Sequence, residues 1–387
     1  MTQPKPQSPK TKIVQAGIGT DPAHRSVAPP LYLSSTYLAP SPSEKGEFDY
    51  GRTNNPNRSI LADALAELDG GTGAVVTTSG MAAIDLVLNL ISADDLVIAP
   101  HDCYGGTHRL LTHRAKQGRI RVQFIDQSDE SALNEALKAK PALVMIETPS
   151  NPLMRVVDVK AICTAAKIAG AISVVDNTFL TPLRLKPLEL GADIALQSTT
   201  KYINGHSDII GGCVVAKSTE HAQQLAWWAN AAGVTASAFD CHQTLRGLRT
   251  LALRLDAAES NALAIAKFLE TQEAVKQVYY PGLRSDPGHA LVHAQQSGPG
   301  AMLSFEIKGG LTAATEFCGS LKIFKLAASL GGVESLICLP ETMTHAGMAE
   351  NARREAGISD SLLRLSIGIE SEKDLLADLE AGFSYIE

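Results

Sequence analysis

Cysteine is scarce in this sequence, and the few cysteines do not form a recognisable motif. The 387 residues contain six, none of them in CxxC spacing: Cys103, Cys163, Cys213, Cys241, Cys318 and Cys338. Zinc sites and disulfide frameworks use closely spaced cysteines, so neither is indicated and we expect no metal site. Reduced thiols are the simplest interpretation, and we therefore expect a cytoplasmic protein.

Long apolar runs and an excess of positive charge are also missing. No segment approaches the roughly 18 uninterrupted apolar residues of a membrane span. The first twelve residues, MTQPKPQSPKTK, lack the apolar centre of a secretory signal. The 34 basic residues are outnumbered by 41 acidic ones, and the net charge of −7 argues against a nucleic-acid surface. We expect small-molecule partners, with neither a membrane nor a nucleic acid among them.

Short apolar runs alternate with helical patterns between about residues 60 and 215. Runs that are apolar throughout, separated by segments with apolar residues at helical spacing, predict a mostly parallel sheet that is covered on both faces. Seven strands are expected, at 73–78, 95–100, 121–126, 142–147, 171–176, 193–198 and 211–216. The predicted fold class is therefore α/β.

The pattern changes near residue 240. Residues 244–272 predict one long helix, possibly broken near Gly247, which leads into a less regular set of strands and helices. Such a set predicts a smaller α+β domain, and a chain of this length exceeds one compact core. We expect an N-terminal arm over 1–60 that contacts a neighbouring subunit, an α/β domain over 61–255 and the smaller domain over 256–387.

Polar residues follow the predicted strands, where open α/β sheets bind their ligands. A Ser-Gly turn at 79–80 begins a helix and could bind phosphate through its N–H groups, or Ser79 could simply cap that helix. Asp176 ends an apolar strand, and Lys201 lies between two apolar runs. A lysine rarely occupies such a setting without a partner.

Asp176 and Lys201 together predict a pyridoxal 5′-phosphate (PLP) cofactor. A PLP enzyme needs a lysine for the Schiff base and an acid that keeps the pyridine nitrogen protonated. Ser198 and Thr200 flank the lysine and can donate hydrogen bonds to the cofactor phosphate. Taken alone, Asp176 could equally be a helix cap.

Further candidates each have a plainer alternative. Tyr104 precedes two glycines and could stack on a cofactor ring, or the stretch could be an ordinary turn. Arg52, close to Tyr50, suits a phosphate but could be a solvated loop arginine. Arg364 lies in an apolar strand, where it could bind a substrate carboxylate or form an internal salt bridge.

The histidines do not indicate a metal site. His108 and His113 are expected on a surface helix face, because no cysteine or acidic ligand accompanies them in a recognisable pattern. His345, in MTHAG, has no role that the sequence suggests.

From about Val27 to the C-terminus, the chain resembles the transsulfuration, or Cys/Met-metabolism, family of fold-type I PLP enzymes. The resemblance is carried by motifs that occur in order along the chain: YGRTNNP, TTSGMAA, DCYGGTHRL, ETPSNPL, VVDNTFLTP, STTKYINGHSD and SLGGVESL followed by MTHAG. It implies an aspartate aminotransferase-like PLP domain and a homotetramer built from dimers with shared active sites.

The resemblance also implies roles for individual residues. Lys201 carries the cofactor and moves protons, Tyr104 stacks on the ring, and Asp176 pairs with its nitrogen. The phosphate would be held by Gly80, Met81, Ser198 and Thr200, joined by Tyr50 and Arg52 of an adjacent subunit. Substrate contacts are implied for Asp49, Arg109, Asn151, Ser329 and Arg364.

Within the family, HDCYGGTHRLL, AWWANAAGVTASAFD and LRGLRTL are most similar to bacterial γ-replacement enzymes. These replace the acyl group of O-succinyl- or O-acetyl-L-homoserine by L-cysteine, which gives L-cystathionine for methionine biosynthesis. Two positions depart from the family pattern: Ala328 stands where a glutamate is typical of γ-specific members, and Thr53 stands in place of a second arginine. Both departures leave the acyl donor open.

Three alternatives accompany this expectation. Cystathionine γ-lyase, cystathionine β-lyase and homoserine sulfhydrylase share nearly all of these residues. A binding protein without chemistry would lack the lysine or the aspartate, and both are present. A nicotinamide enzyme is disfavoured because no GxGxxG follows the first predicted strand.

Overall fold

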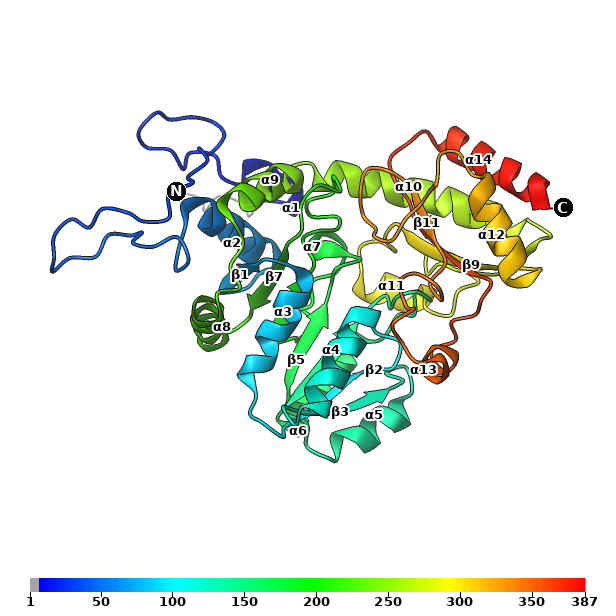
Figure 1. Cartoon of the computed structure of the whole chain (residues 1–387), viewed down its shortest axis with the longest axis horizontal. Helices are drawn as coiled ribbons and strands as arrows, with labels where there is room; N and C mark the ends of the chain where they lie inside the picture. Colours follow the sequence, from blue (N-terminus) through cyan, green and yellow to red (C-terminus); the bar gives the residue numbers. More distant parts are fainter. Residues whose placement is uncertain (1–6, 387) are drawn as a thin grey trace.

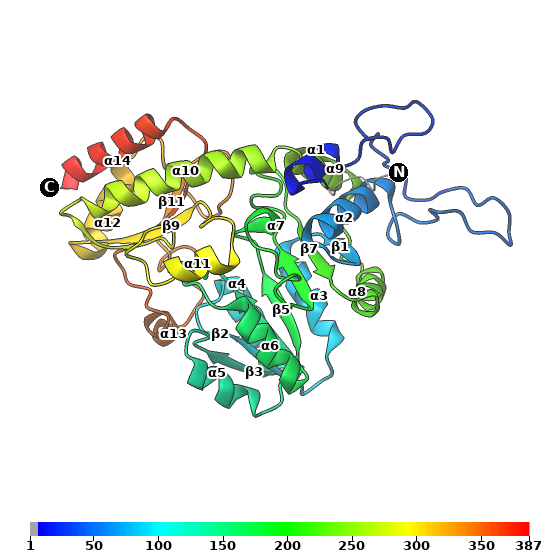
Figure 2. The same ribbon diagram turned by 180° about the vertical axis from the view of Figure 1, so that it is seen from behind.

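The computed structural model describes residues 7–386, which form two sheets with their helices and a projecting arm. Helix α1 (Pro9–Gln15) is followed by residues 16–55, which contain no regular helix or strand. These residues form the two blue loops that extend away from the body in Figures 1 and 2. The boundaries expected at residues 60 and 255 remain a prediction.

The larger sheet has seven strands in the order β1-β7-β6-β5-β4-β2-β3. The strands are β1 (Gly73–Thr77), β2 (Leu96–Pro100), β3 (Arg121–Ile125), β4 (Leu143–Glu147), β5 (Ile172–Asp176), β6 (Ile194–Gln197) and β7 (Gly212–Ala216). Only β7 runs antiparallel to its neighbours. All seven predicted strands are present, and the predicted α/β class with a mostly parallel sheet is confirmed.

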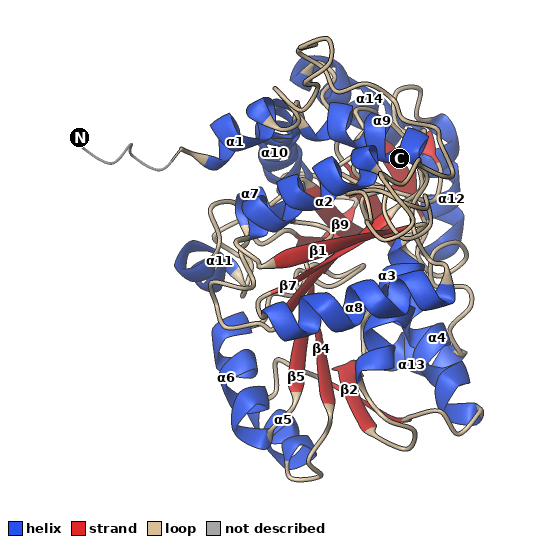
Figure 3. Ribbon diagram, turned by 90° about the vertical axis from the view of Figure 1, so that its left-hand side faces the viewer, coloured by secondary structure: helices blue, strands red, loops and turns tan. Residues whose placement is uncertain are grey.

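Alternate residues of these strands enter two separate hydrophobic clusters. Along β4, Val144 and Ile146 belong to one cluster, whereas Leu143 and Met145 belong to the other. Side chains of successive strand residues point to opposite faces, so a strand that is apolar throughout requires cover on both. Figure 3 shows helices on both sides of the red strands.

In the described part of the chain, seven helices lie beside this sheet. They are α2 (Pro56–Asp69), α3 (Gly80–Val87), α4 (Gly105–Lys116), α5 (Glu130–Leu137), α6 (Val159–Ala169), α7 (Thr181–Arg184) and α8 (Thr219–Ala232), with a 3₁₀ turn, η1 (Leu88–Leu90), after α3. All of them except α4 and α7 begin at a polar cap residue. Asn55, Asp129 and Asp158 each accept hydrogen bonds from free N–H groups of the first turn. Gly70 and Gly170 end α2 and α6 in the left-handed conformation.

The long helix expected over 244–272 is two helices, α9 (Ala238–Leu248) and α10 (Leu251–Glu270). The expected break near Gly247 is confirmed and lies at residues 249–250, which start two residues after this glycine. A side chain at Gly247 would overlap the carbonyl oxygen of Asn204, so glycine lets α9 approach the loop that follows Lys201. The Arg254 guanidinium completes this corner by donating to the carbonyl oxygens of Gly247 (2.8 Å) and Tyr202 (2.7 Å).

The smaller sheet has the order β10-β11-β12-β9-β8 and is mostly antiparallel. Its strands are β8 (Val275–Tyr279), β9 (Met302–Ile307), β10 (Lys325–Leu326), β11 (Leu336–Cys338) and β12 (Leu362–Ser366). The helices around it are α11 (His289–Gln295), α12 (Gly310–Ser320), α13 (Glu350–Glu355) and α14 (Glu372–Ile386). The expected smaller α+β part is present, and its core includes Phe305, Phe317 and Phe383, whose rings lie 4.7–6.4 Å apart.

Two structural features bear on the excluded function classes. Among residues 7–386, no helix is both long and apolar enough to cross a bilayer. In the same residues, no group of three or more histidine, cysteine, aspartate or glutamate side chains is arranged to bind a metal ion.

Candidate active site

The candidate site lies at the edge of the larger sheet where six parallel strands end. Because only β7 is reversed, the carboxyl ends of β1, β4, β5 and β6 meet at the same edge as the amino end of β7. Asp176 is the last residue of β5, and Ser79, Ser198 and Lys201 lie within four residues after β1 and β6. The larger sheet therefore brings together side chains from segments that are more than 100 residues apart in the sequence.

The loops that carry Asp176 and Lys201 are joined by hydrogen bonds. Asp176 Oδ1 accepts from the backbone N–H of Thr178 (3.0 Å) and from its hydroxyl (2.5 Å). The same hydroxyl oxygen accepts from the N–H of Ser198 (2.9 Å), which begins the lysine loop. Burial raises the pKa of Asp176, against the effect of the two Thr178 hydrogen bonds. Its carboxylate thus faces the edge from which the lysine projects.

Lys201 is held by polar groups rather than by an acidic partner. Its Nζ donates to Ser329 Oγ at 2.9 Å, and none of the ion pairs among the described residues includes it. Burial, together with repulsion from the nearby Arg364, lowers the pKa of Lys201 to about 8. About a tenth of this amine is therefore neutral at pH 7, far more than for an exposed lysine, and the neutral form can act as a nucleophile or a base.

Close packing at glycines joins the start of α3, the lysine loop and the Tyr104 loop. A Cβ at Gly80 would lie 2.8 Å from Ser198 Cβ, so the start of α3 packs directly against Ser198. A Cβ at Gly106 would lie 2.5 Å from the Tyr104 ring and 2.9 Å from Met81 Sδ. These contacts place the N–H groups of a helix start, a serine hydroxyl and an aromatic ring together.

The plainer alternative for Ser79 is also observed, and Thr200 has a structural contact of its own. Ser79 caps α3, since its Oγ accepts from the N–H of Ala82 (3.0 Å). Thr200 shares its hydroxyl with Gly211, whose carbonyl oxygen accepts at 3.1 Å and whose N–H donates at 3.0 Å. Neither role prevents phosphate binding, because the first turn of a helix has four N–H groups without an intrahelical partner and the Ser79 side chain accepts from one of them.

The internal salt bridge considered for Arg364 is absent from the described residues. This buried side chain on β12 donates from Nη1 to Asn151 Oδ1 and from Nη2 to the Ser329 carbonyl oxygen, both at 2.9 Å. Its Nε is buried without a partner in the described part of the chain. A buried cation with only neutral partners has a strong preference for an anion, and a carboxylate suits its planar group.

The residues expected from an adjacent subunit lie on the projecting arm. Tyr50 and Arg52 are exposed, with the Arg52 guanidinium 5.6 Å from the centre of the Tyr50 ring and bound to the Asn230 carbonyl oxygen (2.5 Å). Asp49 accepts from the Tyr50 N–H (2.6 Å). No hydrogen bond or ion pair in residues 7–386 joins these three to Lys201 or Asp176. Arg109 is exposed on α4, beside Gly347.

Glu147, which the sequence did not single out, connects two parts of the site. It ends β4 directly beside Asp176 of β5 and accepts from the backbone N–H groups of Tyr104 (2.8 Å) and Asn151 (3.1 Å). Burial and the neighbouring Asp176 carboxylate raise the pKa of Glu147 well above its ordinary value. Its position in the ETPSNPL motif was the only signal in the sequence.

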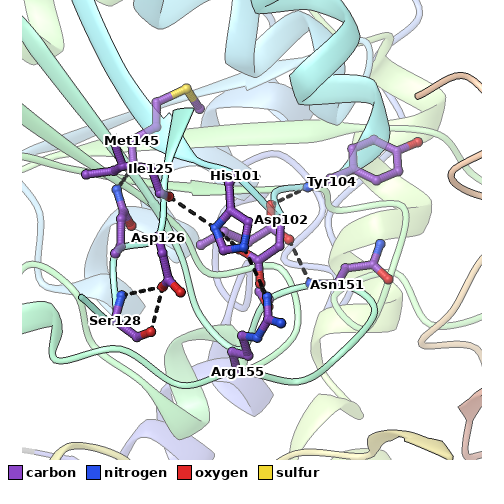
Figure 4. A network of polar contacts seen from close by, with 12 residues as sticks. His101, Asp102, Tyr104, Ile125, Asp126, Ser128, Met145, Asn151 and Arg155 are labelled. Carbon is purple, nitrogen blue, oxygen red and sulfur yellow. Dashed lines mark hydrogen bonds and ion pairs between the residues drawn. The ribbon is translucent and has the colours of Figure 1, made fainter. Parts of the chain in front are cut away.

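A polar network braces the loop that carries Asn151. The buried Asp102 accepts from the Ser150 hydroxyl (2.6 Å) and from Arg155 Nη1 (2.9 Å), and Arg155 also contacts His101 Nε2 (3.3 Å). Figure 4 shows His101, Asp102 and Arg155 below Tyr104 and beside Asn151. Asp102 stands two residues before Tyr104, so the network joins the tyrosine loop to the asparagine loop.

The predictions for the histidines need one correction. His113 is exposed, as expected. His108 is half-buried instead, because its ring stacks on Phe124 at 4.2 Å, and burial lowers its pKa. His345, which had no expected role, is buried and contacts the carbonyl oxygen of Asn151 through Nε2 (3.0 Å).

The arrangement fits PLP in its donor set. The N–H groups at the start of α3 and the Ser198 hydroxyl suit a phosphate, and the Tyr104 ring lies beside Gly106, close to Met81 of α3. Asp176 can face a pyridine nitrogen, and Lys201 supplies the amine. Arg364 remains available for a carboxylate of a substrate.

Comparison with known proteins shows a PLP-dependent family over almost the whole chain. Residues 10–384 match the family model described as Cys/Met metabolism PLP-dependent enzyme. The chain is 54% identical to cystathionine γ-synthase of Escherichia coli over 374 residues, which cover 96% of this chain and 97% of that protein. It is 44% identical to a cystathionine β-lyase of Lactococcus lactis subsp. cremoris over 371 residues, with 96% and 97% covered.

Solved structures are similar over almost the whole chain. A cystathionine γ-synthase of Xanthomonas oryzae pv. oryzae in complex with cystathionine superposes with a TM-score of 0.98 at 54% identity, and 99% of both chains is covered. The same enzyme is also known in complex with aminoacrylate and cysteine, with a TM-score of 0.98 at 53% identity over 99% of both chains.

Proposed function

Since the chain belongs to the Cys/Met metabolism family of PLP-dependent enzymes, we propose that it is a cystathionine γ-synthase. The reaction replaces the acyloxy group of an O-acyl-L-homoserine by the thiol sulfur of L-cysteine. A carbon–oxygen bond breaks, a carbon–sulfur bond forms, and the products are L-cystathionine and a carboxylic acid. One observation carries the chemistry: a lysine with a lowered pKa, at the end of β6, lies beside an arginine that lacks an acidic partner.

Different residues would bind different parts of the cofactor. Lys201 would hold PLP covalently, Asp176 would keep its ring nitrogen protonated, and Tyr104 would stack on the ring. Gly80, Met81, Ser198 and Thr200 would bind the phosphate, with Tyr50 and Arg52 of a second subunit. When bound, PLP supplies an electron sink that acidifies the Cα and Cβ protons of the substrate.

The chain itself binds the substrate and moves its protons. Arg364 would bind the α-carboxylate, with Asn151 and Ser329 holding the guanidinium in place. Once released from the cofactor, the Lys201 amine would take the Cα proton, because burial favours its neutral form. Ser329 Oγ, 2.9 Å from Nζ, would keep the amine oriented for this transfer. Asp49 and Arg109 remain candidates for contacts to the distal end of the substrate.

The direct test is the product formed from each substrate pair. The purified protein should form cystathionine from cysteine with O-succinyl- or O-acetylhomoserine, and the ratio of kcat/KM for the two esters identifies the donor. A Lys201→Ala variant should be inactive with both. Absence of cystathionine here, with rapid pyruvate release from cystathionine alone, would overturn the assignment.

A lyase is the second candidate, because two observations favour it. Ala328 precedes Ser329 at the position where γ-specific members typically have glutamate, and the chain is 44% identical to a cystathionine β-lyase. Pyruvate from cystathionine would indicate β-cleavage, whereas 2-oxobutyrate would indicate γ-cleavage. The incubation with cystathionine alone therefore separates all three activities.

We also propose a homotetramer of dimers in the cytoplasm. The projecting arm exposes apolar side chains, including Leu33 (73% exposed) and Leu38 (98%), which a second copy would cover. All six cysteines are unpaired and buried, which suits a reducing compartment. Light scattering coupled to gel filtration measures the mass, and a monomer would contradict the shared site.

A further inference from the structure

Asn151 is held by three separate parts of the molecule. Its backbone N–H donates to Glu147 Oε1 (3.1 Å), its carbonyl oxygen contacts His345 Nε2 (3.0 Å), and its side-chain Oδ1 accepts from Arg364 Nη1 (2.9 Å). The residue is 3% exposed. Both main-chain groups are thus fixed by side chains, one from the end of β4 four residues earlier and one from a segment 194 residues later.

The His345 contact has one possible direction. A carbonyl oxygen only accepts, so Nε2 must carry the hydrogen and Nδ1 is the acceptor for the Thr344 hydroxyl (2.9 Å). Burial, with the nearby Arg364, lowers the pKa of His345 to about 4, so the ring is neutral near pH 7. A neutral donor contributes no charge repulsion toward the Arg364 guanidinium.

Glu147 also contacts the loop that carries Tyr104. The second carboxylate oxygen of Glu147 accepts from the Tyr104 N–H at 2.8 Å. One carboxylate therefore fixes the main chain of both Tyr104 and Asn151. The segment of His345 reaches the same loop, because a Cβ at Gly105 would lie 3.0 Å from the Thr344 carbonyl oxygen. Figure 4 shows Tyr104 and Asn151 near each other.

We propose that Glu147 and His345 are positioning residues, which fix the main chain of Asn151 from two sides so that its Oδ1 stays on Arg364. This inference rests on the proposed function, because it assumes that Arg364 binds the carboxylate of an amino acid. With Asn151 displaced, Nη1 of the buried arginine loses an acceptor and the guanidinium loses its fixed orientation. The expected consequence is weaker binding of the carboxylate.

The test measures amino-acid binding separately from turnover. The PLP-loaded protein is titrated with L-alanine, and the change in the visible absorbance of the cofactor yields a dissociation constant. Ethylamine, which lacks the carboxylate, is the matched probe. His345→Leu should weaken alanine binding about tenfold, whereas His345→Gln keeps an N–H donor and should stay within about threefold of the parent.

Glu147→Gln tests the other side of Asn151. The amide offers one acceptor and one donor, so one of the two backbone N–H groups loses its partner. Alanine binding should again weaken about tenfold, while ethylamine binding should not change in any variant. Thermal unfolding of each loaded variant shows whether it is folded. If His345→Leu fails to fold, His345→Phe keeps the ring shape and removes the donor.

Matched controls are His113→Leu and Glu135→Gln, both at exposed positions. They should bind alanine as the parent does. Unchanged alanine binding in the His345 and Glu147 variants would overturn the proposal, and so would an equal loss for ethylamine, which indicates a general structural effect. If the parent itself shows no spectral response to alanine, the proposed function fails rather than the positioning role.

Discussion

At the scale of single residues, the environment of Lys201 favours the two roles proposed for its amine, nucleophile and base. An exposed lysine is almost fully protonated at neutral pH and is a poor nucleophile. In this fold the amine is mostly removed from solvent and faces a guanidinium, and both effects favour the neutral form. The hydroxyl of Ser329 then orients it without adding a charge.

Uptake of PLP by the cofactor-free chain should depend on this titration. Because only the neutral amine attacks the aldehyde, the rate should rise with pH and level off above a midpoint near pH 8. Arg364→Leu removes the repelling charge, so the midpoint should move to higher pH. Stopped-flow absorbance measures both, and a midpoint near 10.5 in the parent would contradict the burial argument.

Asp69 provides a second prediction at this scale. It is fully buried on α2, with Oδ2 bound by Gln197 Nε2 (2.8 Å) and Oδ1 without a partner in residues 7–386. Burial raises its pKa to about 8, so the folded state favours the protonated acid. This contribution to stability is complete below the unfolded pKa near 4 and is lost as the pH rises toward 8.

Asp69→Asn should therefore become more stable relative to the parent as the pH rises. The difference in unfolding free energy should grow by a few kcal/mol, up to about 4, between pH 5 and pH 8. Urea unfolding of both proteins at the two pH values measures it. A difference that is independent of pH would show that Asp69 is ionised in the folded state.

At the scale of elements, the corner between α9 and α10 connects the fold to the lysine loop. Gly247 allows α9 to touch Asn204, and Arg254 binds the carbonyl oxygens of Tyr202 and Gly247. The sequence showed a helical pattern with a glycine inside it, but only packing decided that the helix breaks after residue 248. The same contacts fix residues 202 and 204, which follow Lys201 in its loop.

Gly247→Ala should destabilise the protein by about 2–3 kcal/mol and lower its PLP content. The added methyl group overlaps a backbone oxygen, which cannot move without displacing the lysine loop. Gly319→Ala in α12 is the matched control, because a Cβ there meets nothing within 4 Å. That variant should be unchanged or up to about 1 kcal/mol more stable. Equal effects in both variants would contradict the packing argument.

At the scale of the whole molecule, one chain holds an incomplete set of the expected phosphate ligands. Gly80, Ser198 and Thr200 lie together at the sheet edge, whereas Tyr50 and Arg52 lie on the projecting arm. The arm exposes apolar side chains that are costly to leave in water. A second copy that covers the arm would also complete the site.

This sharing can be tested by mixing two inactive variants. Lys201→Ala lacks the amine, and Arg52→Ala lacks the guanidinium that is expected to act in the neighbouring site. After dissociation and random reassembly, half of the dimers are hybrids with one intact site each, so about a quarter of the parental activity should return. Each variant reassembled alone is the control. No recovery would mean that every chain uses its own Arg52.

The sequence by itself determined the seven strands of the larger sheet, because uninterrupted apolar runs bounded by polar residues are a local property. It also indicated Asp176 and Lys201, because an acid and an amine at strand ends are chemically unusual whatever the fold. The short strands β10 and β11 were not predictable, since they have two and three residues and depend on partners in the assembled sheet.

Only the tertiary structure decided the roles of Glu147 and His345. The first binds the main chain of a residue 43 positions away, and the second that of a residue 194 positions away. No pattern along the chain encodes such contacts, because backbone N–H and carbonyl groups are the same in every residue. Which of them lacks a partner, and which side chain reaches it, depends on how the sheets and loops pack.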